Sequence, residues 1–158
     1  MIRIHFERGR SFLEYLIMGI QAAKIKRLNV HFREVYSHVT IELDGIVYQT
    51  KPSGGFSIKP YTEQNSNFPE RRKTYVIHER FYNEIANRLI TYQFSNQSYP
   101  YFKAFFNGIY SLTGKYYGRK NPKKVHCYSF VAKMLGMSEW WKKDAIDIEI
   151  QIINNMKI

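Results

Sequence analysis

The sequence contains one cysteine, Cys127, and no run of apolar residues long enough to cross a membrane. A single cysteine excludes an internal disulfide framework and a cysteine-rich structural zinc site, and it suits a reducing compartment. A transmembrane helix needs roughly 18 consecutive apolar residues, so none is expected. Residues 1–8 mix charged with apolar side chains and lack the apolar segment of a secretory signal. We therefore expect a cytoplasmic protein, or one packed in a viral particle if a phage encodes it.

Acidic residues are few. Asp and Glu number 13 against 24 Lys and Arg, which gives a net charge of +11 at pH 7. Such a field attracts an acidic protein, nucleic acid or an anionic membrane surface without choosing among them, and general basicity of the source proteome explains it equally well. One window without any acidic residue holds five of the cations, namely Lys115, Arg119, Lys120, Lys123 and Lys124.

The composition suits one globular domain spanning residues 1–158. Hydrophobic residues make up 44% of the chain and aromatic residues 16%, which excludes a disordered chain and provides for a self-sufficient core. No linker or repeat divides the sequence. Alternation predicts strands over 1–6, 56–58 and 74–77, and apolar spacing predicts helices from Ser11, over 79–90, from Pro100 and from Cys127. The tail, residues 146–152, fits a strand or a helix.

The segment 36–49 gives the clearest structural signal. Apolar and polar residues alternate before Asp44-Gly45, a dipeptide that favours the tight type I′ turn of a hairpin. Pairing Leu43 with Ile46 across this turn places Thr40 opposite Gln49 and His38 opposite Lys51. His38 and Gln49 then share a polar face within side-chain reach, and the other face is apolar. The sequence therefore predicts an α+β fold with a central antiparallel sheet flanked by helices.

Cys127 is the candidate nucleophile. It is the first residue of a predicted amphipathic helix, where the helix dipole favours the thiolate, and the basic window that precedes it acts in the same direction. The alternative is a small core residue, because a lone cysteine on an apolar helix face is usually one. A catalytic thiol also needs a base and a group that orients the base, for which His38 and Gln49 are the candidates. Each of these two is otherwise an ordinary polar strand residue.

Four motifs in order carry a family resemblance. They are Gly9-Arg10-Ser11 before a helix, Ser37-His38-Val39-Thr40-Ile41, Asp44-Gly45-Ile46-Val47-Tyr48-Gln49-Thr50, and His126-Cys127-Tyr128-Ser129-Phe130-Val131-Ala132. Together they resemble the circularly permuted papain-like, NlpC-type cysteine hydrolase superfamily, in which the histidine strand precedes the nucleophile helix. That superfamily includes permuted amidase- and peptidase-like proteins and relatives of lecithin retinol acyltransferase. The resemblance covers about residues 2–140 and implies a permuted papain-like fold.

The resemblance implies a role for each matching residue. Cys127 corresponds to the nucleophile, His38 to the general base and Gln49 to the third position, where a Glu, His or other polar residue often stands. Gln49 can orient an imidazole but cannot stabilise an imidazolium as a carboxylate does. We interpret His126 as a capping or pocket-lining residue, and place it with the basic window on a substrate or partner surface. His5, His31 and His78 have no metal-ligand spacing and are expected to be structural or exposed, so no metal or cofactor is expected.

The implied function is a cysteine-dependent hydrolase or acyltransferase that acts on an amide or ester bond through an acyl-thioester. The substrate and the choice between hydrolysis and transfer remain open at this point. The alternative is a noncatalytic binding or accessory protein, such as a phage-encoded one, that uses a basic surface on an inherited papain-like scaffold.

Overall fold

The computed structural model describes residues 1–9, 12–29, 34–51, 55–62, 72–93, 109, 112–115 and 125–158. Several predicted features lie outside these ranges. They include the proposed cap Ser11, His31, and the helix predicted from Pro100 apart from Ile109. The four basic residues Arg119, Lys120, Lys123 and Lys124 also lie outside the described residues, so the basic window is represented by Lys115 alone.

Five strands form one antiparallel sheet in the order β4-β3-β2-β1-β5. Their bounds are β1 (Ile2–Glu7), β2 (His38–Leu43), β3 (Ile46–Lys51), β4 (Gly55–Pro60) and β5 (Arg72–Ile77). The strand that begins the chain is thus paired on both sides, with β2 and with β5. The predicted α+β fold with a central antiparallel sheet is confirmed, and each strand predicted by alternation is present.

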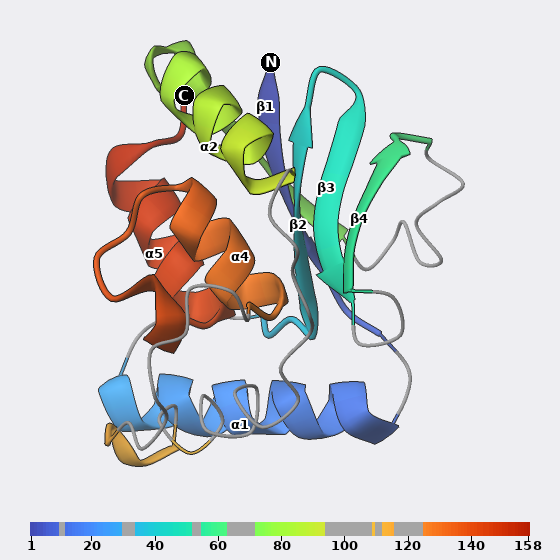
Figure 1. The fold of residues 1–158 in the computed structure, drawn as a ribbon. Coiled ribbons are helices and arrows are strands. Elements are labelled where there is room, and N and C mark those ends of the chain that lie inside the picture. Colours follow the sequence, from blue (N-terminus) through green and yellow to red (C-terminus); the bar gives the residue numbers. More distant parts are fainter. Residues whose placement is uncertain are drawn as a thin grey trace.

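Four α-helices occur among the described residues, namely α1 (Phe12–Leu28), α2 (Tyr82–Gln93), α4 (Cys127–Met134) and α5 (Ala145–Asn155). Helices α2, α4 and α5 lie on one side of the sheet, and α1 lies across one end of the fold (Figure 1). The tail is therefore helical. Asp144 begins α5, since its carboxylate accepts hydrogen bonds from the backbone N–H groups of Ile146 and Asp147. No helix of the described ranges is long and apolar enough to cross a membrane.

The hairpin forms as the sequence predicts. Asp44 and Gly45 both have positive φ, at 49° and 80°, as a type I′ turn requires, and Leu43 pairs with Ile46. The β2–β3 ladder, however, ends at Ile41–Tyr48, so the predicted pairs nearer His38 are not part of it. At that end β2 stays in register with β1 instead, where Glu7 lies opposite His38.

One face of the sheet forms the core. Alternate residues of β1 and β2, including Phe6, Val39 and Ile41, are fully buried beneath the helices, as their alternation predicts. Phe130 of α4 packs against both Phe56 and Tyr92, with ring centroids 5.5 and 5.0 Å away. This packing holds α4 against β2 and β3, which brings its N-terminus to the sheet.

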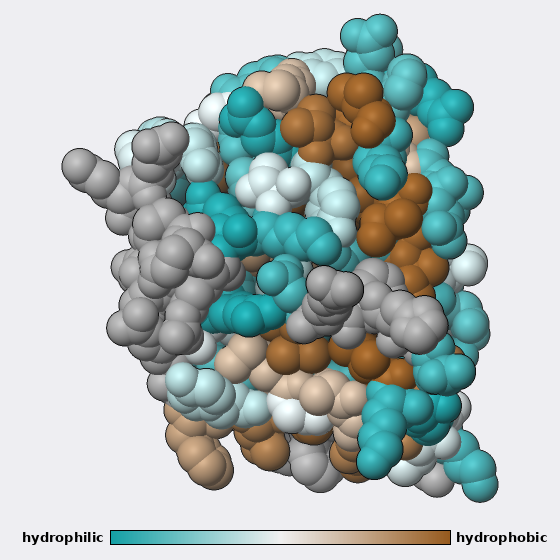
Figure 2. Space-filling model, turned by 180° about the vertical axis from the view of Figure 1, so that it is seen from behind, coloured by the Kyte–Doolittle hydropathy of each residue, from teal (hydrophilic) through white to brown (hydrophobic). Residues whose placement is uncertain are grey.

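Helix α1 does not bury the apolar side chains of its first turns, although their helical spacing predicts a buried apolar stripe. Phe12 is 85% exposed, and Leu13, Tyr15 and Leu16 are more than half exposed. Apolar side chains are visible along the lower edge of the molecule, at the level of α1 (Figure 2). The buried residues of α1 are Met18 and two polar residues, Gln21 and Lys24, and the contacts of these two explain the orientation. Gln21 binds Tyr36 and Tyr128, and Lys24 binds two carboxylates of the α5 N-terminus.

Candidate functional site

His38 and Gln49 meet on neighbouring strands. His38 Nε2 lies 3.2 Å from Gln49 Oε1, which is the diagonal contact predicted from the hairpin. Because an amide oxygen only accepts hydrogen bonds, His38 Nε2 carries the proton. In the neutral imidazole this leaves the lone pair on Nδ1. Gln49 thereby fixes both the ring and its tautomer.

Two carboxylates act on His38 as well. Burial lowers the pKa of His38, and the negative charges of Glu7 and Glu14 act in the opposite direction. Glu7 lies opposite His38 in the β1–β2 register, and Glu14 belongs to the first turn of α1. Neither residue was among the sequence candidates. The signal for Glu7 is its strand alternation, because Arg3, His5 and Glu7 share the face of His38.

Cys127 is the first residue of α4 and is only 6% exposed. Burial raises the pKa of its thiol to about 12, while hydrogen bonds from backbone groups of Val39, Tyr128 and Cys127 itself act in the opposite direction. The sequence expectation that the helix start would favour the thiolate is therefore wrong for this structure. Packing of α4 on the sheet removes the sulfur from water, and this desolvation outweighs the favourable dipole.

The structure sets Cys127 beside the strand that carries the predicted base. The thiol is within hydrogen-bonding reach of the backbone of Val39, the residue that follows His38. Among the contacts of the described residues there is no direct hydrogen bond between the thiol and the imidazole. The structure therefore joins His38 to Gln49 on the polar face of the sheet and places Cys127 on the core face, against the backbone of the adjoining residue Val39.

His126 caps helix α4. Its Nδ1 accepts a hydrogen bond from the Ser129 backbone N–H at 3.4 Å, and Ser129 Oγ accepts one from the His126 backbone N–H at 3.0 Å. This reciprocal capping box confirms the capping role predicted for His126. His126 is 2% exposed, so it does not add to a surface as the sequence analysis had also proposed. Lys115, in contrast, is exposed.

A buried amide fixes the approach of α4 to β2. Gln21 Nε2 donates to the Tyr36 carbonyl at 2.6 Å and to the Tyr128 hydroxyl at 3.0 Å. The Tyr128 hydroxyl in turn donates to the same carbonyl at 2.8 Å, and the Tyr36 N–H donates to Gln21 Oε1 at 3.1 Å. The residue after Cys127 and a residue shortly before His38 are thus held by one side chain of α1.

His5 has a structural role, as predicted. It is buried, and its two ring nitrogens lie 2.8 Å from Glu42 Oε2 and 2.8 Å from Thr74 Oγ1. His78 is exposed and caps a short 3₁₀ helix, residues Glu79–Phe81. No cluster of three or more His, Cys, Asp or Glu side chains suited to a metal ion occurs within the described part of the chain.

Comparison with known proteins adds no family assignment. No protein-family model matches the sequence, and a search of curated proteins finds no significant relative.

Proposed function

We propose that the protein is a cysteine-dependent hydrolase or acyltransferase, built on a circularly permuted papain-like scaffold, that acts on an amide or ester carbonyl. The observation that carries this proposal is the arrangement of three elements. Gln49 holds the His38 ring at 3.2 Å, and Cys127 at the start of α4 lies within hydrogen-bonding reach of Val39, the next residue of the same strand. Nucleophilic catalysis requires the thiol and the imidazole to come within hydrogen-bonding reach, and the proposal places that meeting where β2 begins beside the start of α4.

The chemistry follows from the proton positions. Cys127 Sγ attacks the substrate carbonyl carbon as its proton passes to Nδ1 of His38, and the carbonyl electron pair moves onto oxygen. Backbone N–H groups at the start of α4 stabilise this oxyanion. The intermediate then collapses, the leaving amine or alcohol takes the proton from His38, and an acyl-thioester remains. Water or an acceptor amine or alcohol completes the cycle.

The raised pKa of the Cys127 thiol determines the protonation states of Cys127 and His38 before the reaction begins. With a pKa of about 12 for Cys127 and a lowered pKa for His38, both groups are neutral at pH 7. The pair is therefore a thiol and an imidazole at rest, not an ion pair. Proton transfer accompanies the attack, and His38 acts as a general base in the strict sense.

The same burial favours a second candidate, a noncatalytic binding protein on an inherited scaffold. A cysteine that is 6% exposed with a pKa of about 12 has the properties of a core residue. The two functions differ in two properties. An enzyme exposes Cys127 to an electrophile in the folded state, and its His38 assists the reaction of the thiol; a binding protein does neither.

Thiol alkylation tests the proposal. With iodoacetamide at pH 7, we expect native wild-type protein to be modified at Cys127, and we expect His38→Ala to slow the reaction by about 10²-fold or more, since a general base contributes that much. Mass spectrometry follows the modification, and melting curves establish that the variant is folded. The proposal is overturned if wild type and His38→Ala react at the same rate and only after unfolding in urea.

Gln49→Glu gives an independent prediction about the same ring. A carboxylate in place of the amide stabilises the imidazolium, so we expect the pKa of His38 to rise relative to wild type. Gln49→Ala, which removes the partner without adding charge, is the matched control and should not raise it. Titration of the His38 ring protons by NMR measures both variants. An unchanged His38 pKa in Gln49→Glu would mean that the contact does not tune the ring.

A further inference from the structure

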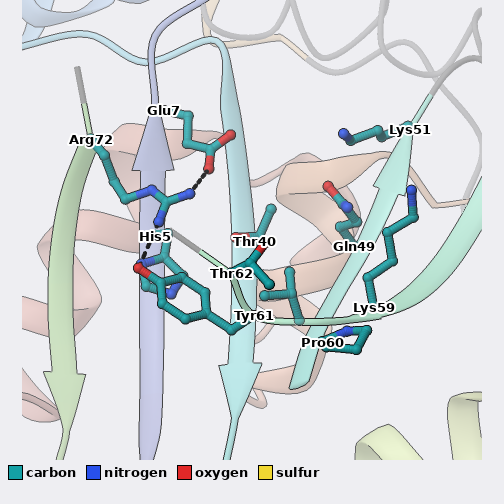
Figure 3. A pocket seen from close by; sticks show the side chains of 11 residues that line it. His5, Glu7, Thr40, Gln49, Lys51, Lys59, Pro60, Tyr61, Thr62 and Arg72 are labelled. Carbon is teal, nitrogen blue, oxygen red and sulfur yellow. Dashed lines mark hydrogen bonds and ion pairs between the residues drawn. The ribbon is translucent and has the colours of Figure 1, made fainter. Parts of the chain in front are cut away.

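A small pocket lies on the face of the sheet that carries the polar residues of β1, β2 and β3 (Figure 3). Its volume is about 80 Å³, and its lining includes Thr40, Gln49, Lys51, Lys59, Tyr61 and Arg72. The cavity holds a group of a few atoms and not a whole drug-sized ligand. Gln49 belongs both to this lining and to the hydrogen bond with His38.

The lining carries an excess of positive charge. Glu7, which also lines the pocket, is neutralised by Arg72, whose Nη2 donates to it at 2.8 Å. The ammonium groups of Lys51 and Lys59 form no ion pair with any described residue. Figure 3 shows both lysine side chains on the same side of the pocket, with Gln49 next to them. Two unneutralised cations therefore remain at the pocket.

Hydrogen-bond donors accompany these charges. Gln49 is 7% exposed and uses its oxygen for His38, and its amide N–H groups form no hydrogen bond with a described residue. The Tyr61 hydroxyl accepts from Arg72 Nη1 at 3.0 Å and keeps its own proton to donate. Arg72 Nε is buried and has no hydrogen-bond partner among the described residues. Such an unpaired buried donor is costly unless a ligand or water satisfies it.

The wall of the pocket is held in place by stacking. The Tyr61 ring stacks on buried His5, with centroids 5.4 Å apart and planes inclined by 10°, and Arg72 lies 5.5 Å from the Tyr61 centroid. His5 is itself fixed by Glu42 and Thr74. The Tyr61 hydroxyl and the Arg72 guanidinium are therefore positioned before any ligand arrives, which lowers the entropic cost of binding.

We propose that this pocket binds an oxyanion, a phosphate or carboxylate group of a ligand. Lys51 and Lys59 supply the opposite charge, and the Gln49 amide and Tyr61 hydroxyl supply directed hydrogen bonds, which are stronger when the acceptor is ionised. The site shares Gln49 with the proposed catalytic pair but uses neither Cys127 nor the His38 ring, so anion binding and thiol reactivity are measured separately. It lies next to the His38–Gln49 pair, so the bound group would occupy the space beside the base.

Titration with inorganic phosphate tests the site, with acetate as the carboxylate probe and sodium chloride at equal ionic strength as the blank. ¹H–¹⁵N NMR spectra should show saturable shifts of the Gln49 side-chain amide and of the Thr40 and Lys59 backbone amides. The double variant Lys51→Gln, Lys59→Gln should weaken binding by about tenfold or more, since charge-assisted hydrogen bonds are lost. Lys26→Gln, at an exposed α1 position, is the control with the same type of charge loss and should bind as wild type does.

A second variant separates a built site from general basicity. Tyr61→Phe keeps the net charge and the ring but removes the hydroxyl, and it should weaken phosphate binding measurably. The proposal is overturned if phosphate and acetate cause no shifts beyond the chloride blank. It is also overturned if the lysine double variant and Lys26→Gln weaken binding equally, because the anion would then sense only the overall charge. Preference for phosphate over acetate, or the reverse, identifies which oxyanion the site suits.

Discussion

Replacing Lys24 with methionine is expected to lower the free energy of unfolding by about 3–5 kcal/mol, because it breaks a buried ion cluster from one side. Lys24 is 3% exposed, and its Nζ lies 2.9 Å from Asp144 Oδ2 and 2.9 Å from Asp147 Oδ1. Without the ammonium, two carboxylates at the start of α5 lose their shared cation. Burial and the neighbouring Asp144 already raise the pKa of Asp147. Urea denaturation at pH 7 measures the loss.

Two further variants test whether the loss of stability comes from the buried ion cluster. Lys26→Met changes the same residue type at an exposed position of α1 and should alter stability by less than about 0.5 kcal/mol. Adding Asp147→Asn to Lys24→Met removes one of the two carboxylates and should recover part of the stability. Equal effects of Lys24→Met and Lys26→Met would contradict the ion cluster as the contact that orients α1.

A second large effect is expected at alkaline pH. The pKa of the Cys127 thiol is about 12 in the folded protein and about 8.5 in an unfolded chain. The folded state therefore retains a proton that the unfolded state releases, so the stability contributed by this group is complete below pH ~8.5 and is lost as the pH rises toward 12. The slope amounts to roughly 1.4 kcal/mol per pH unit. Urea denaturation at pH 7, 9, 10 and 11 measures it.

Cys127→Ala should reduce this alkaline slope by that amount, whatever it does to the stability at pH 7. Val131→Ala is the matched control, because it truncates a fully buried residue of the same helix that does not titrate. This variant should lower the free energy of unfolding at every pH and leave its dependence on pH as in wild type. An unchanged slope in Cys127→Ala would mean that the thiol titrates near its ordinary pKa. A lowered thiol pKa, as the sequence predicts, would instead make the stability of wild type rise with pH below about 8.5, and Cys127→Ala would lack that rise.

The parts of the site that the sequence predicts are those set by local rules. Alternation along β2 and the Asp44-Gly45 turn together determine the hairpin, and the hairpin brings His38 to Gln49, eleven positions away. The start of α4 is equally local, since His126 and Ser129 cap it reciprocally. In these segments, residue type and spacing suffice.

The parts that the sequence did not predict depend on packing between distant segments. The thiol pKa is set by how closely α4 packs on the sheet, which the helix pattern does not contain. The exposed Phe12 follows from polar anchors on the opposite face of α1, and the two partners of Lys24 lie 120 and 123 positions away. The spacing of the isoleucines in the tail suits both a strand and a helix. The cap at Asp144, together with packing against the core, stabilises the helix.

The hydrogen bonds of the Gln21 side chain to Tyr36 and Tyr128 also have a consequence for the order in which the chain folds around Cys127, His38 and Gln49. Tyr36 and Tyr128, which this side chain joins, are separated by 92 positions in the chain, whereas His38 and Gln49 belong to one hairpin. During synthesis the imidazole and its orienting amide can meet while the cysteine has yet to be added. Cys127 reaches β2 only when the long loop between Tyr36 and Tyr128 closes, and such closures are slow steps in folding. A chain released early thus carries the His38–Gln49 pair without Cys127.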